Sequence, residues 1–168
     1  MCLIVDANVG PKFLLESSAI IDWLFGDRGA PRLVAAGKLR EELAANRGVS
    51  RQLVQLDRAG RLRSADPKKL EDEERRLRIA SIFRSNDPHV LALAIVSGAR
   101  TLATGDNALA DDFKNKRIID APRGKVYRDP EAHRHLLCHT SSGGSVTVSR
   151  RATCQLGPES TPAKMYAT

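Results

Sequence analysis

The sequence predicts an α/β protein with three layers, in which helices cover both faces of a mainly parallel sheet of four to five strands. Short apolar runs with strand character alternate with longer segments of helical periodicity, a pattern typical of parallel sheets. The run from Val90 to Val96 is apolar on every side, as expected of a helix buried against such a sheet. With 168 residues, of which 42% are apolar, the chain is long enough for one domain with a sizeable core.

The first part of the chain divides into short strands and the helices between them. Turn-forming residues mark the boundaries: Gly26 and Gly60 end helical runs, and Pro31 and Gly37 enclose an apolar segment. The expected elements are a strand at 2–5, a helix at 13–25, a strand at 32–36, helices at 38–46 and 50–59, and a strand at 61–65.

The second part begins with two helices that share a start signal, an aspartate followed by proline. The first helix, from Asp66-Pro67 to about Phe83, carries acid-to-arginine pairs spaced i,i+4, which are typical of an exposed face. The second starts at Asp87-Pro88 and ends at Gly98, and strands are expected at 101–104 and 117–119. Ten of the last 29 residues are Ser or Thr, so we expect a domain over 1–139 and a disordered tail over 140–168.

Charge is distributed unevenly along the chain. The net charge is +7, and the segment from Lys114 to Thr168 holds ten Lys or Arg against four Asp or Glu. A basic end favours a polyanionic partner such as RNA, although a basic protein without a nucleic-acid partner has the same composition.

The cysteines and the N-terminus predict a soluble protein of the cytoplasm. The three cysteines are widely spaced and include no Cys-x-x-Cys pair, so a disulfide framework is not expected. The start of the chain has no basic leader, and no run approaches the roughly 20 apolar residues that cross a bilayer. We therefore expect no membrane association.

Three aspartates lie where an open α/β sheet binds its ligands. Asp6 closes the first predicted strand, Asp106 follows the strand at 101–104, and Asp87 begins the apolar helix that leads into that strand. Ligands of such sheets bind in the crevice beyond the carboxyl ends of the strands. Three carboxylates in one crevice repel each other unless a cation neutralises them. The arrangement therefore indicates a divalent-metal site.

A fourth acid comes from the Glu41-Glu42 pair. On a helix that advances 100° per residue, Ala36, Leu39 and Leu43 form the buried stripe. Glu41 lies nearly opposite that stripe, whereas Glu42 lies at its edge and can reach a cleft beside the core. We therefore choose Glu42 as the fourth candidate.

At this point the sequence resembles the PIN-domain nucleases. The resemblance rests on three motifs, and their order, spacing and structural context agree over roughly residues 2–120. They are Leu3–Val9 (LIVDANV), Ser85–Ala94 (SNDPHVLALA) and Thr101–Asp106 (TLATGD).

The resemblance implies a metal-dependent endoribonuclease, often the toxin of a toxin–antitoxin pair. It implies RNA as the substrate, an antitoxin protein as a partner, and a homodimer. It also implies that Asp6, Asp87 and Asp106 are the metal-binding acids, with a weaker match at Glu42. Polar residues that orient the acids or a bound water fall at Asn8 and Thr104.

The chemistry fits the same residues independently. Hydrolysis of a phosphodiester needs a neutralised phosphate, a deprotonated water and a stabilised leaving oxygen. One or two Mg²⁺ or Mn²⁺ ions supply all three, and these hard cations prefer carboxylate oxygens.

Other polar residues have simpler interpretations. Asp111 and Asp112 follow Asp106 closely, but exposure is the expectation for both. His133, His135, Cys138 and His139 contain an i,i+4 histidine pair that could hold zinc, yet a structural zinc site needs four convergent ligands. We therefore expect a basic, partly exposed helix there, able to contact phosphate.

Two other functions remain open. Asp6 and the region after Gly105 also resemble the first and last motifs of haloacid-dehalogenase-like phosphatases, with Asp6 as nucleophile. Against that reading, Asn8 stands where a second, general-acid aspartate would be needed. The third possibility is a catalytically inactive PIN-like module that binds RNA.

Overall fold

The sheet of this computed structural model, which describes residues 1–15, 17–26 and 30–137, has five parallel strands in the order β3-β2-β1-β4-β5. The strands are β1 (Cys2–Val5), β2 (Arg32–Val34), β3 (Leu62–Arg63), β4 (Thr101–Ala103) and β5 (Lys125–Tyr127). All four neighbouring pairs are parallel. The expected α/β class and parallel sheet are therefore confirmed.

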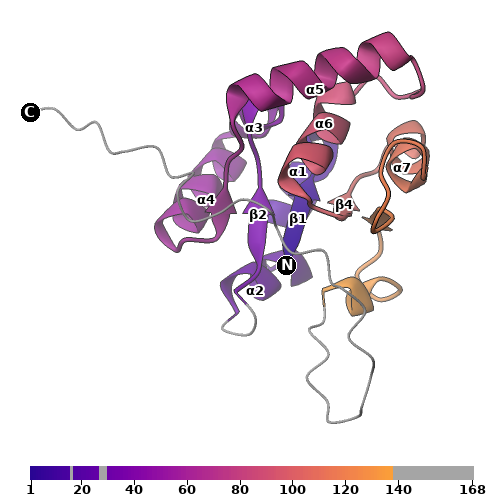
Figure 1. Cartoon of the computed structure of the whole chain (residues 1–168). Helices are drawn as coiled ribbons and strands as arrows, with labels where there is room; N and C mark the ends of the chain where they lie inside the picture. Colours follow the sequence, from indigo (N-terminus) through magenta and orange to yellow (C-terminus); the bar gives the residue numbers. More distant parts are fainter. Residues whose placement is uncertain (16, 27–29, 138–168) are drawn as a thin grey trace, which may run out of the picture.

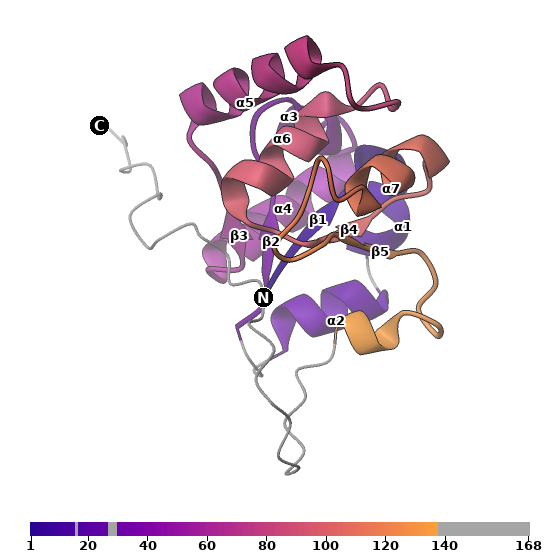
Figure 2. The same cartoon turned by 45° about the vertical axis from the view of Figure 1, so that its right-hand side comes forward.

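Within the described residues, seven α-helices connect the strands and cover the sheet, in keeping with a three-layer fold (Figures 1 and 2). Helix α5 lies across the outside of α6, and the two are in extensive contact (Figure 1). The helices are α1 (Gly10–Leu14), α2 (Ala19–Phe25), α3 (Gly37–Ala44), α4 (Arg47–Arg58), α5 (Pro67–Ala80), α6 (Pro88–Ser97) and α7 (Asn107–Lys114), with short 3-10 turns η1 (Ala7–Val9) and η2 (Arg134–Leu136).

The core lies where β1 and α6 meet the other elements. Every side chain of β1 is buried, and the stretch from Val90 to Ala94 in α6 is at most 1% exposed. Full burial of a Leu or Val side chain contributes roughly 1.5–3 kcal/mol. Ile95 and Val96 are half-buried, so this helix is buried over most of its surface, close to what its apolar sequence predicts.

The single helix expected over 13–25 is in fact two helices. Ser18 separates them: its hydroxyl donates to the carbonyl of Phe13 at 2.5 Å and accepts from the N–H of Ile21 at 3.1 Å, which caps α2. Ser17 adopts a φ of 69°, which is incompatible with a continuing helix. The prediction was wrong because serine side-chain bonds compete with the helical backbone here.

The last strand was also predicted wrongly. Residues 117–119 form a turn, in which the N–H groups of Ile118 and Ile119 both bond to the carbonyl of Asn115. The fifth strand is β5, which pairs with β4 in the register Leu102 to Val126. Both isoleucines are buried, so their apolar character reflects packing rather than a strand.

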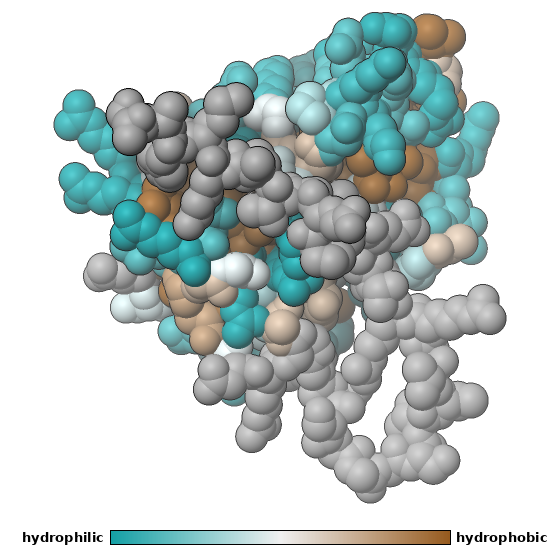
Figure 3. Space-filling model, turned by 60° about the vertical axis from the view of Figure 1, so that its left-hand side comes forward, coloured by the Kyte–Doolittle hydropathy of each residue, from teal (hydrophilic) through white to brown (hydrophobic). Residues whose placement is uncertain are grey.

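Helix α5 has the charged surface that its sequence predicts. Arg75 lies 2.9 Å from Glu71 and Arg78 lies 2.7 Å from Glu74, and all four side chains belong to i,i+4 pairs. Leu77 is the buried residue of this helix. At the top of the molecule, where Figure 1 places α5, hydrophilic residues dominate the face shown in Figure 3.

Three expectations about the whole chain have different outcomes. Cys2 is disulfide-bonded, whereas the cysteine pattern predicted no disulfide framework. Cys138, Cys154, the domain boundary at 139 and the predicted tail over 140–168 lie outside the described residues. None of the helices in the described part of the chain has the length and apolar character needed to cross a membrane.

Candidate functional site

The candidate site lies where the strand order reverses. The chain builds β1, β2 and β3 in one direction across the sheet, then returns to place β4 on the other side of β1. Val5 pairs with Ala103 in register, and the N–H of Asp6 donates to the carbonyl of Ala103 at 2.9 Å. In open α/β sheets the ligand crevice lies at such a switch point, beyond the carboxyl ends of the strands.

A hydrogen-bonded chain joins the ends of β1 and β4. The buried hydroxyl of Thr104 donates to Oδ2 of Asp6 at 2.7 Å and accepts from the N–H of Asp106 at 3.0 Å. The Asp6 carboxylate is therefore held in one orientation by a residue 98 positions later. Thr104 thus orients an acid, as the resemblance implies.

Burial and a neighbouring acid raise the pKa of Asp6 above its usual value. The side chain is 5% exposed, so desolvation is the largest cause. The negative charge of Asp87 raises the pKa further. The Thr104 hydroxyl and the backbone N–H groups of Ala7 and Asn8 lower it in part. The sum of these effects favours the protonated form of Asp6 more than in a free aspartate.

Asp87 and Asp106 both begin helices, but only one of them caps with its side chain. Oδ1 of Asp106 accepts from the N–H of Leu109 at 2.9 Å, so it caps α7. Asp87 occupies the cap position of α6 but makes no side-chain capping bond, and it is half-buried. The sequence pattern predicted a cap at Asp87. The structure instead leaves its carboxylate outside the helix hydrogen-bond network.

Glu42 reaches the same region from α3. It is half-buried whereas Glu41 is exposed, as helix geometry predicts. Its Oε2 lies 3.1 Å from Nε2 of His89, and its Oε1 lies 3.6 Å from Nζ of Lys38. His89 is 6% exposed and belongs to α6, two residues after Asp87. Glu42 is therefore tied to the helix that Asp87 begins.

Within residues 1–15, 17–26 and 30–137, no three acidic, histidine or cysteine side chains lie close enough together to hold a metal ion in this conformation. The donor set nevertheless suits a hard cation, because it consists of carboxylate oxygens at a sheet switch point. A divalent ion would also offset the burial of Asp6 and the charge of Asp87, which raise the pKa of Asp6.

Two expectations about nearby residues have clear outcomes. Asn8 is exposed in η1 and acts on Asp6 through its backbone N–H, whereas Thr104 acts on that acid through its side chain. Asp111 is exposed as expected, but the expectation was wrong for Asp112, which is 3% exposed. Its carboxylate accepts backbone N–H bonds, which removes the cost of burial.

A basic residue that lies beside Asp106 was not predicted from the sequence. Nη2 of Arg128, just beyond β5, donates to the backbone carbonyl of Asp106 at 3.0 Å. This places a guanidinium at the edge of the acidic group. The signal in the sequence was weak, because β5 itself was not predicted.

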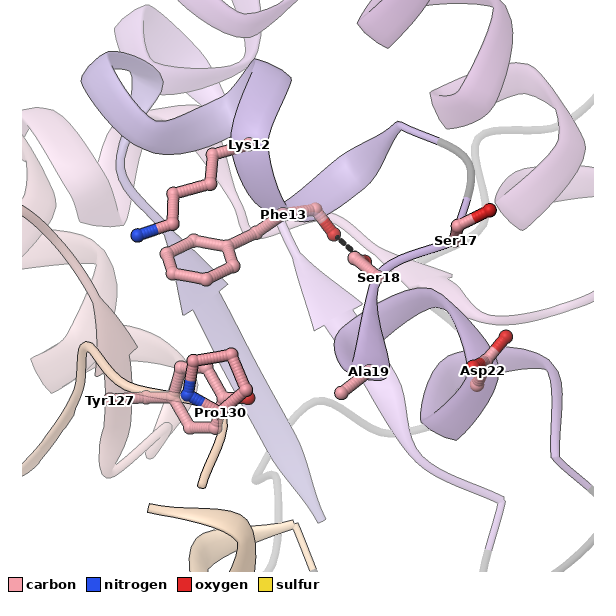
Figure 4. Close-up of a pocket in the computed structure, with 8 residues that line it drawn as sticks. All are labelled: Lys12, Phe13, Ser17, Ser18, Ala19, Asp22, Tyr127 and Pro130. Atoms are coloured by element: carbon pink, nitrogen blue, oxygen red, sulfur yellow. Dashed lines mark hydrogen bonds between the residues drawn. The ribbon is translucent and has the colours of Figure 1, made fainter. Parts of the chain in front are cut away.

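A separate cavity of about 460 Å³ lies between α1, α2 and the end of β5 (Figure 4). Lys12, Phe13, Ser18 and Tyr127 contribute to its wall, and none of the four acids does. Phe13 and Tyr127 meet edge to face with ring centroids 5.5 Å apart. The cavity is thus distinct from the acidic group.

The histidine cluster near the end of the domain does not form the expected helix over its described part. Nδ1 of His133 accepts from the N–H groups of Arg128 and Asp129 at 3.1 Å, which occupies that nitrogen in a turn. His135 is exposed in η2. Cys138 and His139 lie outside the described residues.

Comparison with known proteins gave no match: no family model, curated protein or solved structure matches this chain.

Proposed function

We propose that this protein is a metal-dependent endoribonuclease that hydrolyses RNA phosphodiester bonds with Mg²⁺ or Mn²⁺. The observation that supports this most directly is the link at the β1–β4 switch point, where the Thr104 hydroxyl donates to the buried Asp6 carboxylate and accepts from the N–H of Asp106. Burial, and after it the charge of Asp87, raises the pKa of Asp6. Holding carboxylates near one another costs free energy, so their arrangement is not explained by stability. A divalent cation gives the arrangement a use.

In this proposal each acid has a defined part. Asp6 and Asp87 would hold the ion, and Asp106 and Glu42 would complete the set of oxygen donors. Thr104 keeps the Asp6 carboxylate in one orientation through its 2.7 Å hydrogen bond. An ion held there would supply charge neutralisation at the phosphate and would make water acidic enough to act as the nucleophile.

Positive charge near the crevice supports a polyanionic substrate. Arg128 belongs to the basic part of the chain that begins at Lys114, and its guanidinium donates to the backbone carbonyl of Asp106. Cationic side chains beside a site hold phosphates without reading the base sequence. An antitoxin partner and a homodimer stay predictions from the resemblance.

The decisive experiment measures cleavage of a labelled RNA with Mn²⁺, with Mg²⁺ and with EDTA. Asp6→Asn and Asp87→Asn should each lower the rate more than about 100-fold, since even partners of metal ligands are worth 10–100-fold. Circular dichroism should show the fold unchanged.

Glu42→Gln and Glu41→Gln form the matched pair, because the two acids are adjacent on α3 but only Glu42 is half-buried. We expect Glu42→Gln to lose cleavage and Glu41→Gln to cleave RNA at the wild-type rate. Full cleavage in both aspartate variants would overturn the proposal. Trapping of an acyl-phosphate on Asp6 would instead establish the phosphatase, whose nucleophile is this residue.

A further inference from the structure

Asp112 lies deep in the protein and bonds to a distant stretch of backbone. Its Oδ2 accepts from the N–H of Ser85 at 2.7 Å and from the N–H of Arg84 at 2.9 Å, and its Oδ1 lies 3.1 Å from the N–H of Arg84. Its side chain is buried. Hydrogen bonds to a charged acceptor are about twice as strong as neutral ones, so this contact fixes the backbone at 84–85 firmly.

The anchored stretch leads directly to the candidate site. Asp87 follows Ser85 by two residues and begins α6. Its own carboxylate makes no capping bond to α6, so the backbone that leads to Asp87 is held by the bonds at Arg84 and Ser85 and not by a cap. Loop segments without such an anchor adopt many conformations.

Helix α7 connects this anchor to a second acid. Asp106 caps the start of α7 through Leu109, and Asp112 lies on the buried face of the same helix, next to the fully buried Phe113. One rigid helix therefore holds Asp106 at one end and the segment preceding Asp87 near the other.

We propose that Asp112 is a positioning residue, which sets the distance between Asp87 and Asp106 by binding the N–H groups of Arg84 and Ser85. This inference rests on the proposed function, because the two acids are taken to share an ion. Asp112 itself contacts neither RNA nor metal. A displacement of about 1 Å in such an arrangement can cost about 100-fold in rate.

The test compares Asp112→Asn with Asp111→Asn in the full chain. The first variant keeps one acceptor oxygen but places an amide donor against backbone donors, whereas Asp111 is exposed on the same helix. We expect Asp112→Asn to weaken Mn²⁺ binding and to lower kcat by 10–100-fold, with KM for RNA unchanged. Asp111→Asn should match wild type in both.

Three further readouts separate positioning from stability. Urea denaturation gives the folded fraction, so each rate is expressed per folded molecule. Hydrogen exchange at Arg84 and Ser85 should accelerate in Asp112→Asn, and Asp112→Glu should restore more of the Mn²⁺ affinity than Asp112→Asn does. Where Asp112→Asn does not fold, Asp112→Glu against wild type carries the comparison.

Lower stability with wild-type kcat and Mn²⁺ affinity per folded molecule would overturn the inference. A wild-type protein that binds Mn²⁺ but leaves RNA intact would overturn the substrate alone, because the Mn²⁺ affinities still test Asp112. A wild-type protein that does neither would overturn the proposed function and the catalytic consequence together, and exchange at Arg84 and Ser85 would then report the anchor by itself.

Discussion

Replacing Thr104 with valine tests the hydrogen-bonded link between β1 and β4 without any assumption about function. Valine has nearly the shape of threonine, so Thr104→Val removes the hydroxyl and leaves the packing intact. Two bonds disappear: the 2.7 Å donation to Oδ2 of Asp6 and the 3.0 Å acceptance from the N–H of Asp106. Both lie at the switch point of the sheet.

The size of the effect follows from what each group loses. A hydrogen bond to a charged group contributes about 1.5–3 kcal/mol, and an N–H left without an acceptor costs about 1–3 kcal/mol. Asp106 is half-buried, so water can replace part of the second bond. We therefore expect Thr104→Val to lower the free energy of unfolding by about 2–4 kcal/mol at pH 7.

Thr104→Ser is the matched control, because it keeps the hydroxyl and deletes one methyl group. Its expected cost is about 1 kcal/mol. Urea denaturation at pH 7 measures both variants. The Thr104 hydroxyl lowers the pKa of Asp6 and so favours the carboxylate. The difference in the free energy of unfolding between wild type and Thr104→Val should therefore shrink as pH falls through the pKa of Asp6. A valine variant as stable as the serine variant at pH 7 would refute the reasoning.

Two other predictions concern buried polar groups. Because burial and Asp87 raise the pKa of Asp6 above 3.8, the folded state binds its proton more tightly than the unfolded state does. Wild type should lose stability as pH rises from 3.8 through the folded pKa, and Asp6→Asn should remove this loss. Denaturation curves from pH 4 to 7 test it, and a wild-type stability that does not fall relative to that of Asp6→Asn across this range would contradict it. The Tyr127 hydroxyl is buried and has no hydrogen-bond partner among the described residues. Tyr127→Phe should therefore raise the free energy of unfolding by up to about 2 kcal/mol, and thermal denaturation that shows a decrease would reveal a partner.

The central part of the fold could be predicted because its elements are mostly buried. The strand at 2–5 is apolar throughout and the helix after Asp87 is apolar from Val90 to Val96, so neither depends on a distant contact for its identity. The choice of Glu42 over Glu41 needed only the angle between successive helical residues. These features are local, and local rules describe them well.

The errors arose where distant backbone decides the structure. Asp112 is buried because two N–H groups 27 and 28 residues earlier in the chain bond to it, which composition cannot reveal. Its spacing from Leu109 and Phe113 places it on the buried stripe of α7, which was a signal of burial in the sequence. The prediction of exposure followed instead from the rarity of buried aspartate in proteins. Strand β5 has only three residues, one of them an exposed lysine, and its identity comes from pairing with β4.

The position of β4 beside β1 also determines when the site can form during synthesis. Asp6 and Thr104 are 98 residues apart, so the inner edge of β1 has no partner strand until Thr101–Ala103 has left the ribosome. Pairings of such long sequence separation form late and slowly. A chain that stops before Thr104 carries Asp6, Glu42 and Asp87 but lacks Asp106 and the hydroxyl that orients Asp6. Such incomplete chains are therefore expected to lack the complete set of acids, so whatever activity the site has begins only after the residues that follow β4 are made.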